Sequence, residues 1–385
     1  MRGSGAYRPS RRALLAGAGA LALWPRPLRA AAAPLHLLAP AVYDDAALLK
    51  HLSAAAKTSV DVKPLKGDED ALAPLRPLLP GASAAERAAR PGLVVSAHPW
   101  LRGILWPEGV VEPLAKHPSA SKLELAPGLD PALAVLETGI EGRYHLGRAL
   151  RFDISALGID RRRVSIDAVG DLGLGILDDP GLTGRIGVVA DPALLLPVVM
   201  LYAGLNPFRL QRPSEWRRFE AGLGQLLDRA AQIFRSEAEA AAALAEGRID
   251  IALPLGLGAL APARLAGNRN LVIATPGHGP LGGMAAFYRV EIMAAVVQAG
   301  PQARLVLDAL DQPAITGALA RAGGGLAPAV GLLAPEARDL LTAAERDALA
   351  LETWPGLLAR CAPMGLVPER VRAYPLLEKA LAGRV

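Results

Sequence analysis

Short apolar runs alternate with amphipathic stretches along most of the chain. The run 35–39 predicts a buried strand, and the stretch 44–56 has apolar residues at helical spacing, which predicts an amphipathic helix. The same two patterns recur further along. We expect more strands at 60–62, 93–96, 185–189, 248–253, 271–274 and 287–293, and more helices at 192–204, 216–235, 302–311 and 336–349. Because strands that alternate with helices typically form parallel sheets, the pattern predicts an α/β fold.

The first 33 residues have the order of an export signal. Ser10, Arg11 and Arg12 are followed by an uncharged run at 13–23 and by small residues at 30–32. The paired arginines resemble a twin-arginine signal, and a general secretory signal is the alternative. Both interpretations predict a periplasmic protein that is cleaved near Ala32. The apolar run is too short to cross a membrane, which argues against an anchor.

Net charge changes once this leader is set aside. The whole chain carries +5, but residues 1–33 hold six arginines and no acid, so taking six from +5 leaves −1 for the remainder. A near-neutral protein lacks the positive charge that binds phosphate backbones, which excludes nucleic acid as an expected partner. About 350 residues remain, enough for two domains. The single cysteine, Cys361, predicts a small buried residue and no intrachain disulfide.

No motif predicts an enzyme, a cofactor or a metal centre. The run 277–282 matches G-x-G-x-x-G, but the next segment predicts a strand where a dinucleotide site needs a helix, and Pro280 has no N–H to offer. The six histidines show no H-E-x-x-H spacing. The acidic run 68–70 predicts a solvated helix start. Trp216 and Trp354 are expected to be packing residues.

Three stretches, at 142–147, 183–206 and 245–279, resemble in their order the periplasmic spermidine/putrescine-binding proteins, which are solute receptors of ABC importers. The resemblance implies two α/β lobes of the type II-like class, joined by hinge strands and closing on a ligand in the cleft between them. By this analogy the chain crosses near 144–147 and returns near 275–279. One lobe would comprise 34–143 plus 277–325, and the other 144–276 plus 326–385.

The resemblance also implies ligand residues, because the family boxes the ligand with aromatic rings and pairs its ammonium groups with carboxylates. Tyr43 and Trp100 match aromatic positions, with His98 beside the second, and Asp191 matches one carboxylate. Tyr144 lies at the first crossing.

Other positions depart from the family pattern. Leu255 stands where a tryptophan would stack, Gly283 begins the loop that normally supplies Trp-x-Asp, and Leu194 replaces a second acid. A dication held by one carboxylate would leave an ammonium without a partner, so we expect a ligand other than spermidine or putrescine. Arg148 could face the cleft and favour an anionic or zwitterionic solute; the alternative is a surface arginine at the hinge.

The sequence therefore predicts a monomeric, non-enzymatic, exported solute-binding protein. It would deliver a small polar ligand to an ABC permease in the inner membrane. The alternative is a degenerate binding protein that acts as a periplasmic interaction or assembly partner without cargo.

Overall fold

The strands of the computed structural model form one mixed sheet. The structure describes residues 33–76, 83–114 and 145–384. Within them the strand order is β2-β1-β3-β9-β4-β7-β5-β6, with β10 beside β9 and β8 beside β4. The strands are β1 Leu35–Pro40, β2 Val60–Leu65, β3 Leu93–Ala97, β4 Arg148–Asp160, β5 Ile186–Val189, β6 Ala230–Phe234, β7 Ile251–Leu255, β8 Leu271–Ala274, β9 Phe287–Ala295 and β10 Ala362–Pro363.

Strand direction separates the flanks of the sheet from its centre. The pairs β1–β2, β1–β3, β5–β6 and β5–β7 are parallel, as the strand–helix alternation predicts. The pairs that involve β4 with β7, β8 or β9, and the pair β3–β9, are antiparallel. The prediction of parallel sheets is therefore wrong at the centre, where long strands return without a crossover helix.

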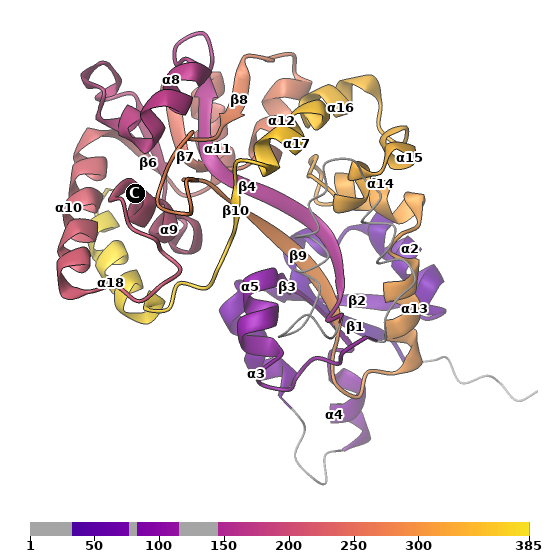
Figure 1. Ribbon diagram of the computed structural model, residues 1–385. Helices are drawn as coiled ribbons and strands as arrows, with labels where there is room; N and C mark the ends of the chain where they lie inside the picture. Colours follow the sequence, from indigo (N-terminus) through magenta and orange to yellow (C-terminus); the bar gives the residue numbers. More distant parts are fainter. Residues whose placement is uncertain (1–32, 77–82, 115–144, 385) are drawn as a thin grey trace, which may run out of the picture. The chain divides into compact units, whose positions relative to one another are not determined.

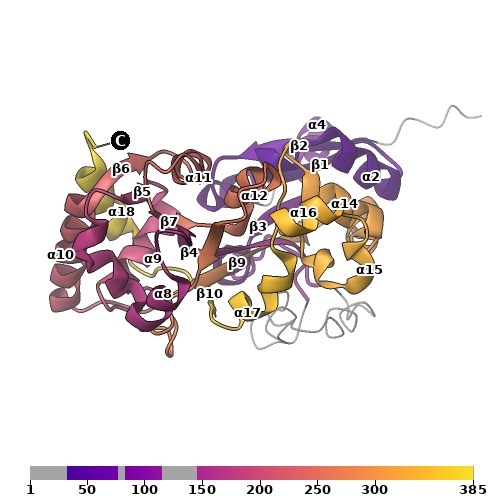
Figure 2. The same ribbon diagram turned by 90° about the horizontal axis from the view of Figure 1, so that it is seen from above.

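Strand β4 belongs to two groups of strands. Its first part, 148–155, pairs with β9, and its last part, 156–160, pairs with β7 and β8. Figures 1 and 2 show β4 and β9 running side by side. Irregular register at Leu150 and Leu157 accompanies the change of partner. The sequence patterns did not predict β4.

Helices pack on the sheet in three groups. In the first, α2 Ala46–Ala56 contacts α13 Pro301–Ala309 and α14 Pro313–Arg321. In the second, α9 Pro192–Tyr202, α10 Pro213–Arg229 and α18 Arg370–Leu381 contact one another. In the third, α12 Leu257–Leu265 contacts α11 Glu237–Ala245 and α16 Ala343–Ala348. Shorter helical segments include η3 Asp68–Ala71, α3 Leu72–Leu75, α4 Ala84–Ala89, α5 His98–Trp100, η4 Leu101–Leu105, α8 Ile166–Leu172, α15 Pro335–Arg338 and α17 Trp354–Leu358.

Helix α2 shows how local chemistry sets the boundaries. Asp45 caps its start by accepting the N–H groups of Ala47 and Leu48, and Lys57 ends it in the left-handed conformation. Leu48 and Leu52 recur at helical spacing and are fully buried. The predicted helix at this position is confirmed.

Two predicted helices differ from the structure. The pattern at 216–235 runs past the end of α10, and residues 230–234 instead form β6, because they pair with β5 and bury Ile233 and Phe234. The pattern at 336–349 is divided into α15 and α16. Thr342 starts α16 with a capping box, in which Glu345 accepts the backbone N–H of Thr342.

The buried side chains form two clusters. The first cluster contains β1, β3, α2, α13 and most of residues 326–361, and it extends to α11 and α12. The second contains β5, α9, α10 and α18. Trp354 and Cys361 lie in the first and Trp216 in the second, so these three residues are packed as the sequence predicts. Burial raises the pKa of the Cys361 thiol to about 12.

Across these same residue ranges, the helices are all too short or too polar to span a lipid bilayer.

Candidate functional site

A cavity of about 580 Å³ opens where several distant segments meet. Part of the lining comes from the carboxyl ends of β1 and β3 and from the residues around η3, and another part comes from the start of α9 and from α18. Strand β9 contributes Arg289 and Glu291. Ligands of open α/β sheets commonly bind beyond the carboxyl ends of parallel strands, so this position favours a binding site.

Charged side chains of both signs line this cavity. Its acids are Asp68, Glu69, Asp191, Glu291 and Glu378, and its bases are Lys66, Arg235, Arg289 and Arg370. Acids therefore outnumber bases by one. The expectation that a single carboxylate faces the ligand is wrong. It rested only on the positions that match the family motif, whereas four of the five acids in the lining lie elsewhere in the sequence. The objection to a dicationic ligand that rested on this expectation does not hold.

The central pair β4–β9 carries a pattern of alternating charges. Arg151 pairs in register with Glu291, and Asp153 pairs with Arg289. Residues two apart on a strand share a face, and paired residues of antiparallel strands share it too. These four residues therefore lie on one face, and each has an opposite charge both across the pair and along its own strand.

Arg289 is the base most surrounded by acids. Burial lowers its pKa, but the nearby carboxylates of Glu291, Asp68, Asp153 and Glu237 outweigh burial and hold the pKa above its ordinary value. Arg289 forms no hydrogen bond or ion pair with any residue that the structure describes. Its guanidinium is therefore charged and keeps its donors available in the cavity.

Asp153 and Glu237 form a half-buried acidic pair beside Arg289. Asp153 accepts the N–H groups of Ile154 at 2.8 Å and Leu257 at 2.7 Å, and Glu237 accepts the N–H of Gly256 at 2.7 Å. Burial raises the pKa of both carboxyls, and the charge of Asp153 raises the pKa of Glu237 further. Two such neighbours do not ionise independently, so they hold a proton near neutral pH.

Among the residues that the sequence singled out, Trp100 and Asp191 line the cavity. Trp100 ends α5, and the guanidinium of Arg370 lies 4.8 Å from its ring centroid. Asp191 caps α9 and accepts the N–H groups of Ala193 and Leu194. Their contact with a ligand stays a prediction.

Tyr43 and His98 lie directly behind the cavity wall. The Tyr43 hydroxyl donates to Glu291 Oε2 at 2.6 Å, and the guanidinium of Arg151 lies 5.3 Å from its ring centroid. His98 Nδ1 accepts the N–H of Val290 at 3.2 Å, and its Nε2 lies 2.8 Å from the carbonyl of Met364. Burial lowers the pKa of His98 to about 4, so the ring is neutral. Both residues support others that line the cavity.

Three further candidates lie away from the lining residues. Arg148 is 4% exposed and pairs with Asp311, which differs from the surface position left open above. Leu255 is fully buried against Gly158. Gly283 lies in an exposed turn with φ +96°. Tyr144 falls outside the described residues.

The motif at 277–282 forms a loop between β8 and β9. A strand follows it, as predicted, so the helix N-terminus that a dinucleotide site requires is not there. Over the described ranges, no cluster of three or more His, Cys, Asp or Glu side chains is arranged to hold a metal ion.

The sequence patterns did not indicate Asp68, Arg289 or Glu291 as site residues. Asp68 begins a helical segment as expected, but it is not simply solvated: its Oδ1 accepts from Ser96 Oγ at 2.7 Å and from Ala97 N at 2.9 Å. Burial raises its pKa. For the other two a signal existed, because Arg289 and Glu291 alternate with apolar residues in a predicted strand and thus share one face.

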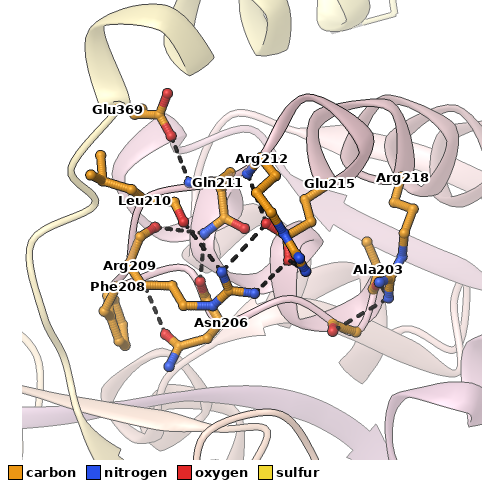
Figure 3. A network of polar contacts seen from close by, with 11 residues as sticks. Ala203, Asn206, Phe208, Arg209, Leu210, Gln211, Arg212, Glu215, Arg218 and Glu369 are labelled. Carbon is orange, nitrogen blue, oxygen red and sulfur yellow. Dashed lines mark hydrogen bonds and ion pairs between the residues drawn. The ribbon is translucent and has the colours of Figure 1, made fainter.

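A polar network fastens the segment before α18, which carries Arg370 to the cavity. The N–H of Gln211 donates to Glu369 Oε2 at 2.8 Å, as Figure 3 shows. Glu215 accepts from Arg209 at 2.6 Å and from the N–H of Arg212 at 2.7 Å. These contacts join the loop before α10 to the segment before α18 and so help to fix one cavity wall.

No protein-family model and no curated protein sequence matches the chain. Solved structures do. The spermidine/putrescine substrate-binding protein PotD of Streptococcus pneumoniae is 12% identical with a TM-score of 0.61, covering 91% of this chain and 99% of PotD. A putative spermidine/putrescine ABC transporter of Listeria monocytogenes is 13% identical with a TM-score of 0.63, covering 91% of this chain and 100% of the other.

Iron-bound HitA of Pseudomonas aeruginosa is 18% identical with a TM-score of 0.52, covering 84% of this chain and 99% of HitA. These structures are substrate-binding or metal-binding proteins that share one architecture at low sequence identity. The chain therefore has the two-lobed α/β fold of the periplasmic binding proteins, as the family resemblance in its sequence implies.

Proposed function

We propose that this protein is a non-enzymatic solute-binding protein that captures a small polar ligand in the cavity and presents it to an ABC permease. The observation that carries the proposal is the cavity itself. Its volume suits a small ligand, and two aromatic rings, those of Trp100 and Tyr374, and nine charged side chains from distant segments converge on it. The likeness in fold to substrate-binding proteins of ABC transporters supports the same function.

The proposal includes export. The leader at 1–33 would direct the chain to the periplasm, by the twin-arginine or the general secretory route, and the near-neutral remainder would act there as a monomer without nucleic acid. The division into 34–143 plus 277–325 and 144–276 plus 326–385 stays a prediction. The alternative of an interaction partner without cargo rests on small or apolar residues, such as Leu255 and Gly283, at positions where the family has ligand-binding residues. The cavity is nevertheless lined by other charged and aromatic side chains, which favours the solute-binding function.

A thermal-shift screen of the purified chain against amino acids, amines, organic acids and sugars tests the proposal. A ligand at a hundredfold excess over its Kd adds about 2.7 kcal/mol of stability. Ala193 lines the cavity, whereas Ala221 is exposed on α10. Ala193→Trp should abolish the shift, and the matched control Ala221→Trp should keep it. A shift that survives Ala193→Trp, or no shift with any solute, would contradict the proposal.

A further inference from the structure

We propose that the cavity takes a zwitterionic solute, with a carboxylate held by Arg289 and an ammonium group held by Asp68 and Glu291. The inference rests on the proposed function and names the ligand class for that same site. The observation that carries it is the guanidinium of Arg289, which lines the cavity without a hydrogen-bond partner among the described residues.

The guanidinium of Arg289 is a receptor for a carboxylate. Arginine presents parallel N–H donors that match the two oxygens of a carboxylate, and such charge-assisted bonds are among the stronger ones in proteins. The acids around Arg289 supply charge but no hydrogen bond, so its donors keep their bonding capacity. A ligand without an acceptor group would bury these donors unsatisfied, which is unfavourable.

The acids beside Arg289 are receptors for an ammonium group. Among the described residues, Asp68 accepts hydrogen bonds from Ser96 Oγ and Ala97 N, both on Oδ1, which leaves Oδ2 to accept from a ligand. Glu291 receives the Tyr43 hydroxyl on Oε2, which leaves Oε1. Both side chains line the cavity. Both lie close enough to Arg289 for their charges to raise its pKa, so groups of opposite charge on one small ligand find partners there.

The balance of charge excludes the two simpler ligand classes. A dianion would meet the one-charge excess of acids in the lining, together with Asp153 behind it. A dication would satisfy the acids but would lie beside the charged, unpaired guanidinium of Arg289. A solute with a carboxylate and one or two cationic groups avoids both penalties, since it matches the excess of acids and pairs with Arg289.

Matched pairs of ligands test this proposal, because an amino acid and its decarboxylation product differ only in the carboxylate. The pairs are ornithine with putrescine, lysine with cadaverine, and arginine with agmatine. Calorimetric titration of the purified chain should show that at least one of these amino acids binds about 10- to 100-fold more tightly than its amine.

Variants then assign the preference to one side chain. Arg289→Lys keeps the positive charge but loses the parallel N–H donors of the guanidinium. The amino acid should therefore bind less tightly, while the affinity for its amine is unaffected. Arg289→Gln should reverse the preference, because it removes both the carboxylate receptor and the repulsion of the amine. The control is Arg304→Gln, whose arginine is 65% exposed in an ion pair with Glu112 outside the cavity lining. It should leave both affinities unchanged.

The outcomes separate this inference from the function it rests on. Tighter or equal binding of the amines overturns the zwitterion assignment and leaves the solute-binding function standing. Binding of none of the six probes also overturns the assignment, and the wider thermal-shift screen then decides the function independently. Melting temperatures of the unliganded variants establish that each is folded, so a lost affinity reports on the site.

Discussion

Asp153 and Arg289 occupy paired positions on β4 and β9, with opposite charges, yet they form no ion pair with each other. Each serves a different neighbour. Asp153 accepts the N–H groups of Ile154 and Leu257, whereas Arg289 lines the cavity. Asp153 thus anchors the start of α12 to the central strand. It acts on Arg289 by electrostatic attraction, without a direct contact. The pairing keeps the arginine charged without occupying its donors.

Asp153→Asn should destabilise the fold. Asn carries no negative charge, so its hydrogen bond from Leu257 N, which is 2.7 Å long in the parent chain, weakens and Arg289 loses a compensating charge. We expect a loss of about 1–3 kcal/mol in the free energy of unfolding, measured by urea denaturation. Asp171→Asn, at an exposed position in α8, should change little. Equal effects of the two substitutions would contradict the anchoring role of Asp153.

Glu237 should make stability depend on pH. Its pKa in the folded chain lies above the ordinary value of 4.5, because of burial and then the charge of Asp153. At pH values between the unfolded pKa and the folded pKa of Glu237, the folded chain keeps a proton that the unfolded chain has lost. The stabilising contribution is therefore full below the unfolded pKa and is lost as pH rises through the folded pKa.

Glu237→Gln removes this titration while its amide oxygen can still accept the N–H of Gly256. Urea unfolding over a series of pH values should give a shallower decline of stability with rising pH in the variant than in the parent chain. The control is Glu220→Gln, at an exposed position in α10, which should retain the parent slope. Parallel curves for Glu237→Gln and the parent chain would rule out the assignment.

Glu215 should show the opposite dependence. Hydrogen bonds from Arg209 and Arg212 lower its pKa to about 2. The folded pKa lies below the unfolded one, so the contribution is present above pH 4.5 and is lost as pH falls through the folded value. Glu215→Gln should therefore be less stable than the parent chain at neutral pH, and the difference should shrink in acid. A constant difference at every pH would show that packing, not charge, matters there.

Trp100 should report ligand binding. Its ring is partly exposed in the cavity, beneath the guanidinium of Arg370. A solute that binds there changes the surroundings of the indole, so intrinsic fluorescence should change on titration. Trp100→Phe should remove most of this change, while Trp106→Phe, outside the cavity lining, should preserve it. If the change persisted in Trp100→Phe, the solute would bind elsewhere.

Sequence patterns predicted the flanks of the fold better than its centre. β1, α2, β3, β5 and α9 follow from local periodicity, because each buries an apolar run or stripe. β6 did not, since its assignment depends on pairing with β5. The charged residues at 151 and 153 interrupt the apolar run of β4, so the sequence pattern does not indicate a buried strand there. In the structure they pair with the charged residues of β9.

The candidate site was predictable only in part. Trp100 and Asp191 follow apolar strands and could be placed at their carboxyl ends. Asp68 and Arg289 are more than two hundred positions apart, and only strand order and register bring them to one cavity. Arg148 is the opposite case. The sequence suggested it as a ligand residue, but in the structure its side chain is buried and pairs with Asp311.

The continuous backbone of β4 joins the strand that carries cavity residues to the strands on its other part. Its residues 148–155 share hydrogen bonds with β9, which carries Arg289 and Glu291, and residues 156–160 share them with β7 and β8. Any displacement of β9 would therefore have to be accommodated along β4, which both groups share. The strand that carries Arg289 and Glu291 is thus coupled to both strand groups through the β4 backbone.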